Sequence, residues 1–155
     1  MSKKRSFFLT LCFFCMVLMM GWIVHFAGYG IRINRSHSLP YSLFWASKVE
    51  DITRNMLVLM HHPKNPSISI VKIVAGLPGD PIEVRNGNVF VNHLYTGKVI
   101  PISKSGQVYT PISAGVIPEG YVFVFGSDPE SFDSKYEEFG LVDMNWIEER
   151  LWVIF

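Results

Sequence analysis

A serine and a lysine in the first half of the chain are residue types that can form a nucleophile and its base. Ser38 lies in the segment Ser-His-Ser-Leu-Pro, residues 36–40, and Lys72 lies in Ile-Val-Lys-Ile-Val, residues 70–74. A serine hydroxyl needs an adjacent base to take its proton, and an uncharged lysine amine can serve. Alone, a serine close to a proline is more typical of a turn. The pair therefore has to be judged with its surroundings.

Lys72 lies inside an alternating apolar segment, residues 68–74, which predicts a strand. Ile68, Ile70 and Val74 share its face. Burial would favour the neutral amine and lower its pKa, as a general base requires. The alternative is an edge-strand lysine that extends to water and prevents aggregation. The strand pattern alone favours that alternative.

A polar segment late in the chain, residues 126–136, offers further hydroxyl and charged groups: Ser131, Asp133 and Lys135. By itself it predicts a loop with local side-chain turns. Three histidines, His37, His61 and His62, raise the alternative of a histidine-based triad or a metal site.

The histidine alternative has weak support in the spacing. His37 directly precedes Ser38, and adjacent side chains on an extended chain point to opposite sides. The pair His61 and His62 lacks a third ligand at a recognisable spacing. Both cysteines, Cys12 and Cys15, fall in the apolar N-terminal run, so the rest of the chain has none for zinc or a disulfide. We expect neither a metal nor a cofactor.

The N-terminal run must position the rest of the chain at a membrane. Residues 7–27 contain no Asp, Glu, Lys or Arg, and a helix of that length crosses roughly 30 Å of hydrocarbon. Bulky Tyr29 and Ile31 follow it in place of a small-x-small cleavage site, which indicates a retained anchor.

Basic residues at the start of the chain, Lys3, Lys4 and Arg5, predict that the N-terminus is cytoplasmic. We expect a cytoplasmic tip over residues 1–6, a transmembrane anchor over 7–28 and an exported domain over 29–155. In a bacterium this places a single-pass protein in the inner membrane, with its main domain in the periplasm.

The sequence pattern of the exported part predicts β structure. Residues 28–37 are expected to form a short polar connection, and Asn86-Gly87 predicts a hairpin because both turn positions need a positive φ. No long helical periodicity follows the anchor. Short segments bounded by Gly, Pro, Asn and Asp predict strands over residues 56–60, 68–74, 82–84, 89–91, 121–125 and 151–155.

The charge balance excludes one class of partner. The chain has 14 Lys and Arg against 13 Asp and Glu, and no basic stripe carries interleaved aromatic residues. Nucleic-acid binding therefore has no support.

Taken together and in this order, the segments resemble the type I signal peptidase family of Ser/Lys proteases, over nearly the whole chain. Lys72 with Ala-Gly-Leu-Pro-Gly-Asp at residues 75–80 looks like the lysine box of the family. Residues 116–126 are similar to the strand that leads into its last box, and Ser131-x-Asp133-Ser134-Lys135 is similar to its Ser-x-Asp-Ser-Arg signature. The resemblance implies a mainly β catalytic domain, with several short strands in coiled antiparallel sheets, behind one N-terminal transmembrane helix.

The resemblance also implies a role for each matching residue. Ser38 matches the nucleophile and Lys72 the general base. Ser36 matches a side-chain donor that joins the Ser38 N–H in an oxyanion hole. Ser131 matches the hydroxyl that orients the lysine, and Asp133 and Lys135 match a supporting ion pair.

The sequence departs from the usual pattern of the family at two places. One residue separates Ser38 from Pro40, whereas the housekeeping enzymes usually have Ser-Met-x-Pro, and Lys135 stands where arginine is usual. Residues 34–45 are more similar to the branch that serves conjugative transfer, where the peptidase matures or helps to cyclise the pilin.

The resulting hypothesis is a membrane-anchored serine endopeptidase that processes an exported, membrane-bound precursor, such as a pilin subunit, at the lipid bilayer. A general signal peptidase that removes leader peptides is the alternative of the same chemistry. A non-catalytic, membrane-anchored scaffold of a secretion or pilus assembly is the alternative of another class. The sequence does not choose between hydrolysis and cyclisation, nor between a membrane-facing and a core position for the aromatic residues Tyr41, Phe44 and Trp45.

Overall fold

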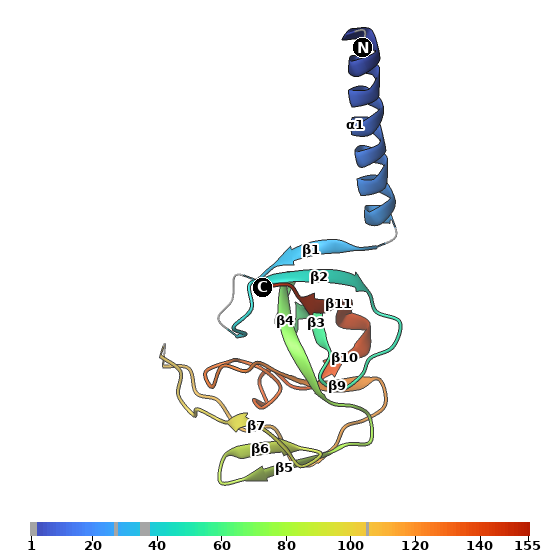
Figure 1. Ribbon diagram of the computed structural model, residues 1–155. Coiled ribbons are helices and arrows are strands. Elements are labelled where there is room, and N and C mark those ends of the chain that lie inside the picture. The colour runs from blue at the N-terminus through green and yellow to red at the C-terminus, as the bar shows by residue number, and fades with distance from the viewer. Residues whose placement is uncertain (1–2, 27, 35–37, 105) are drawn as a thin grey trace.

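A single helix stands apart from a body of antiparallel sheets (Figure 1). The computed structural model describes residues 3–26, 28–34, 38–104 and 106–155. Helix α1, Lys3–Phe26, contains a stretch, Arg5–Val24, that is long and apolar enough to cross a membrane, and none of that stretch is buried against the body. A helix that is apolar on all sides and unpacked is typical of a membrane span.

The body contains two sheets, and every strand pairing within them is antiparallel. The larger sheet has the order β1-β2-β11-β3-β4-β9-β10 and the smaller one β7-β6-β5-β8. A short 3₁₀ turn, Met144–Trp146, precedes the last strand. The strands are β1 Gly30–Ile33, β2 Leu43–Lys48, β3 Leu57–His62, β4 Asn65–Gly76, β5 Pro81–Arg85, β6 Asn88–Val91, β7 Leu94–Lys98, β8 Gly115–Val116, β9 Tyr121–Phe125, β10 Val142–Asp143 and β11 Ile147–Val153.

The mainly β fold behind one apolar helix is confirmed, and so is the hairpin. Asn86 and Gly87 have φ values of 52° and 77°, and they connect β5 to β6 in the register Arg85↔Asn88. All six predicted strand segments overlap observed strands. Local alternation and turn chemistry were sufficient there because each strand carries its own pattern.

The prediction of a polar connection over residues 28–37 is wrong for residues 30–33, which form β1, and β2 was not predicted at all. β1 is short and contains one Gly and one Arg, so local propensity does not indicate a strand. Its partners come from elsewhere in the chain. Gly30–Ile33 pairs with β2, and Arg32 forms an ion pair of 2.5 Å with Glu149 on β11.

Strand β4 packs apolar side chains on both of its faces. Ile70 and Val74 belong to the large core cluster, which also contains Val89 and Val91 of the small sheet and so joins the two sheets. Val71 and Ile73 on the opposite face pack with Leu39, Phe44, Ala46 and Leu151. Residues 65–69 of β4 are exposed, whereas residues 70–76 are covered on both faces, and this second half is a rigid element on which to place a functional group.

The sequence did not decide whether Tyr41, Phe44 and Trp45 lie in the core or at the surface, and the structure divides them between the two. Phe44 is fully buried in the smaller core cluster. Tyr41 and Trp45 are exposed, and the Trp45 ring stacks on Tyr29 with centroids 5.9 Å apart. Tyr29 lies between α1 and β1, so Trp45 faces the end of the body nearest the helix (Figure 1).

Candidate active site

Lys72 is buried in the interior of the larger sheet. Strand β4 pairs with β3 on one side and with β9 on the other, and Lys72 lies opposite Val58 of β3. The residue is 2% exposed. The edge-strand interpretation is therefore wrong: this lysine does not extend to water.

Three oxygen atoms surround the Lys72 amine. Its Nζ lies 2.7 Å from Ser131 Oγ, 2.8 Å from the Phe132 carbonyl oxygen and 3.5 Å from Ser38 Oγ. A neutral amine has two hydrogens and one lone pair. If the hydrogens are donated to Phe132 O and Ser131 Oγ, the lone pair is left for the Ser38 hydroxyl. The 3.5 Å separation is long, but such contacts commonly tighten when substrate binds.

Burial controls the charge of Lys72. Removal from water disfavours the ammonium form and lowers the Lys72 pKa to about 8. The negative charge of Asp133 acts in the opposite direction and raises the pKa, while the positive charge of Lys135 lowers it further. The lysine can therefore lose its proton close to neutral pH, which an ordinary surface lysine does not do.

Ser38 is held from two directions. Leu39, the next residue, is buried with Val71 in the smaller core cluster. The Ser38 carbonyl accepts a hydrogen bond of 3.3 Å from the Asp128 N–H. The backbone is thus fixed on both sides while Ser38 itself remains partly exposed, as a group that must meet a substrate requires. Ser36 lies outside the described residues.

Gly126 fits a space that no larger residue could occupy. A Cβ atom there would lie 2.3 Å from Ser131 Oγ and 2.8 Å from the Ser38 carbonyl oxygen. The absence of a side chain lets the segment after β9 approach both residues. Gly126 and the Phe132 carbonyl are the parts of the site that sequence reasoning missed, because a backbone contact leaves no side-chain pattern.

Asp133 and Lys135 form a buried ion pair close enough to the Lys72 amine to affect its pKa. Their Oδ2 and Nζ atoms are 3.2 Å apart, and the residues are 0% and 1% exposed. Lys135 Nζ also donates to the Ser131 carbonyl at 2.6 Å, and Asp133 accepts from the Gly126 N–H at 3.0 Å. The pair therefore ties the segment carrying Ser131 to the segment beside Ser38.

Of the three candidate histidines, His37 lies outside the described residues. His61 Nε2 is 3.4 Å from Glu148, and the His62 ring stacks with Phe132 at 6.2 Å. Burial lowers the His62 pKa, and the nearby Lys72 lowers it further. Among the described residues, no cluster of three or more His, Cys, Asp or Glu could hold a metal ion.

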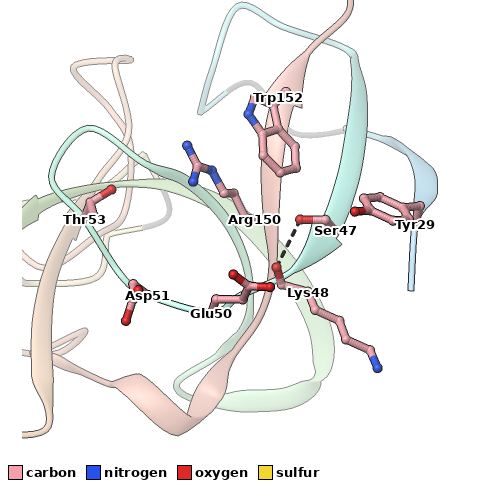
Figure 2. Close-up of a pocket in the computed structure, with 8 residues that line it drawn as sticks. All are labelled: Tyr29, Ser47, Lys48, Glu50, Asp51, Thr53, Arg150 and Trp152. Atoms are coloured by element: carbon pink, nitrogen blue, oxygen red, sulfur yellow. Dashed lines mark hydrogen bonds between the residues drawn. The ribbon is translucent and has the colours of Figure 1, made fainter. Parts of the chain in front are cut away.

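A second surface feature lies at the end of the body nearest the helix. A pocket there has a volume of about 470 Å³ and contains none of the predicted site residues; Figure 2 shows the side chains that line it. It is lined by Tyr29, Ser47, Lys48, Glu50, Asp51, Thr53, Arg150 and Trp152.

Comparison with known proteins gives a consistent result. Residues 4–155 match the family described as "Signal peptidase, peptidase S26". A conjugal transfer protein TraF of Agrobacterium fabrum is 31% identical over 128 residues, which are 69% of this chain and 73% of that protein. A second TraF, from Agrobacterium tumefaciens, is 33% identical over 73 residues, 43% of this chain and 39% of that protein.

Among solved structures, a signal peptidase I from Enterococcus faecalis superimposes with a TM-score of 0.46 at 25% identity. The match covers 67% of this chain and 99% of that one.

The contribution of the Asp133–Lys135 ion pair to stability can be measured. Asp133→Asn would leave the buried Lys135 charge without its partner, and breaking a buried pair costs about 3–5 kcal/mol. We expect a large fall in the free energy of unfolding of the detergent-solubilised protein, measured by urea denaturation. The control is Glu130→Gln, which breaks the exposed pair with Lys104 and should leave the transition unchanged. Equal effects of the two substitutions would contradict the structural role assigned to Asp133.

Proposed function

Because the chain belongs to the signal peptidase, peptidase S26 family, we propose that it is a membrane-anchored serine endopeptidase with Ser38 as nucleophile and Lys72 as general base. The observation that carries the assignment is the position of the Lys72 amine. It is buried, its pKa is lowered to about 8, and it lies between the hydroxyls of Ser131 and Ser38. Burial of a lysine costs free energy, and a buried amine with a lowered pKa beside two hydroxyls is typical of a functional site.

The reaction is acyl transfer. Lys72 takes the proton of Ser38 Oγ as that oxygen attacks the scissile carbonyl, and it then gives the proton to the leaving amine. Ser38 remains as an ester of the acyl fragment until a second nucleophile releases it. The Ser38 N–H and the Ser36 hydroxyl stabilise the oxyanion in this proposal, as the family resemblance implies. Ser131 and the Asp133–Lys135 pair position the lysine.

The substrate in this proposal is an exported precursor that remains in the lipid bilayer. Helix α1 is suited to anchor the chain by length and composition, and Lys3, Lys4 and Arg5 favour a cytoplasmic N-terminus with residues 29–155 in the periplasm. The exposed rings of Tyr29 and Trp45, close to the end of the helix, suit a body held at the membrane surface.

Within this activity we infer pilin maturation for conjugative transfer. The inference rests on the short Ser38-Leu39-Pro40 segment and on the two relatives that are conjugal transfer proteins. Water as the second nucleophile would release a linear product, and the amino group of the substrate would give a cyclic one. General removal of leader peptides is the second candidate, because the same catalytic groups serve both.

The catalytic pair can be tested by replacement. Ser38→Ala removes the nucleophile, and Lys72→Met keeps the apolar volume of the side chain while removing the amine. Each should lower processing of a membrane-bound precursor by at least about a thousandfold, with the thermal transition retained. Lys104→Met, at an exposed lysine, is the control and should process normally. Normal processing by either dyad variant would defeat the enzyme assignment and favour a scaffold.

The pH dependence follows from the lowered Lys72 pKa. Only the neutral amine can accept the Ser38 proton, so the protonated fraction is inactive. We expect kcat/KM to rise with pH, to bend near the Lys72 pKa of about 8 and then to level off. A bend near the ordinary lysine value, or a flat profile, would argue against Lys72 as the base.

The substrate class can be tested by direct comparison. We expect purified protein in lipid vesicles to cut a candidate pilin precursor from the same genome in preference to a generic leader peptide with a small-x-small site. Mass spectrometry of the products separates linear from cyclic forms. Cleavage of the generic leader alone would replace pilin maturation by general leader removal.

A further inference from the structure

A groove borders the candidate active site on the side of the small sheet. It has a volume of about 550 Å³ and lies between two segments. The first, residues 95–101, runs from β7 into the loop that follows it, and the second, residues 125–129, begins at the last residue of β9. Its surface is more apolar than polar. Neither segment has a role in the catalytic assignment above, apart from the backbone contacts of Gly126 and Asp128.

One wall of the groove is the free edge of a sheet. Strand β7 is terminal in the smaller sheet and pairs only with β6. Consecutive residues from Tyr95 to Pro101 all line the groove. A strand that faced a groove with its side chains would contribute every second residue. The continuous lining indicates that β7 presents its backbone edge, which can pair with an added extended chain.

The other wall leads directly to the candidate nucleophile. Gly126 and Asp128 line the groove, and the Asp128 N–H donates to the Ser38 carbonyl. One end of the groove therefore lies beside the residue at which the acyl group would form.

The two walls are connected through the buried ion pair. A Cβ on Gly97, which has φ of 142°, would lie 3.2 Å from the Lys135 Cδ atom. The Lys135 stem thus runs beneath β7, while its amine bonds to the Ser131 carbonyl and Asp133. The position of the groove edge is fixed relative to Ser131, which contacts the Lys72 amine.

We propose that this groove binds the substrate residues that follow the scissile bond, as an extended strand alongside β7. The proposal rests on the proposed peptidase function. Strand β7 has five residues, and a strand advances about 3.3 Å per residue, so the edge accommodates a segment of similar length. The apolar surface favours side chains such as Val, Leu or Ala at alternate positions, and the main-chain pairing is independent of their identity.

The direction follows from the placement of the groove relative to the anchor. Helix α1 and strands β1 and β2 lie at one end of the molecule, and the small sheet with β7 lies at the other (Figure 1). The membrane-inserted part of a precursor approaches from the anchor end, and it forms the acyl side. The residues beyond the scissile bond are left on the side of the small sheet.

The test fills the groove without changing the catalytic groups. Ser127 is exposed and lines the groove, so Ser127→Trp should occupy part of its volume. Ser67→Trp is the matched control, because Ser67 is also exposed and does not line the groove. Two peptides with the same acyl side are compared, one ending a single residue after the scissile bond and one ending five residues after it.

For the wild type and for Ser67→Trp, the longer peptide should have the higher kcat/KM, by about tenfold, because remote contacts on the leaving side assist the reaction. Ser127→Trp should abolish that ratio, because only the longer peptide extends into the part of the groove that the indole fills. Equal rates for both peptides with the wild type would overturn the groove assignment but leave the peptidase intact. An unchanged ratio in Ser127→Trp, which includes an equal loss of rate on both peptides, would also overturn the groove assignment. Failure of the wild type to cut either peptide would overturn the peptidase function itself.

Discussion

The burial of one amine in a β-sheet is the constraint on which the rest of the site depends. Lys72 lies on the interior strand β4, between β3 and β9, with 2% of its surface exposed. At that position the charged form is disfavoured, and the amine has to be satisfied by groups placed for it. Ser131 Oγ and the Phe132 carbonyl meet this requirement. Both come from one loop, and the buried Asp133–Lys135 pair holds that loop in place.

The fold can be understood as the means of bringing three distant segments to that amine. Leu39 packs with Val71 of β4 and so brings Ser38 beside the sheet. Gly126 allows the chain after β9 to approach both Ser38 and Ser131. The core cluster that joins the two sheets then fixes the small sheet, and with it the β7 edge, relative to the same site. The groove and the candidate dyad thus share the Gly126–Asp128 segment.

The sequence was informative wherever a residue carries its own signal. The charge-free run of residues 7–27 predicted helix α1, and Asn86-Gly87 predicted its hairpin, because composition and turn chemistry are local. Lys72 alone was ambiguous, since its strand pattern fits an edge as well as an interior position. Strand order decided that question, and it depends on β9, which lies some fifty residues further along the chain. Strand β1 was missed for the same reason: its stability comes from pairing with β2 and from the Arg32–Glu149 contact.

The central claim is that burial lowers the Lys72 pKa to about 8, so that a useful fraction of the amine is neutral at mildly alkaline pH, and a direct titration tests it. The side-chain amines can be isotopically labelled and followed by NMR in detergent micelles, with the Lys72 signal assigned by its loss in Lys72→Met. The account predicts a pKa of about 8 for Lys72, well below the ordinary lysine value of about 10.4. A Lys72 pKa indistinguishable from those of the exposed lysines would contradict it.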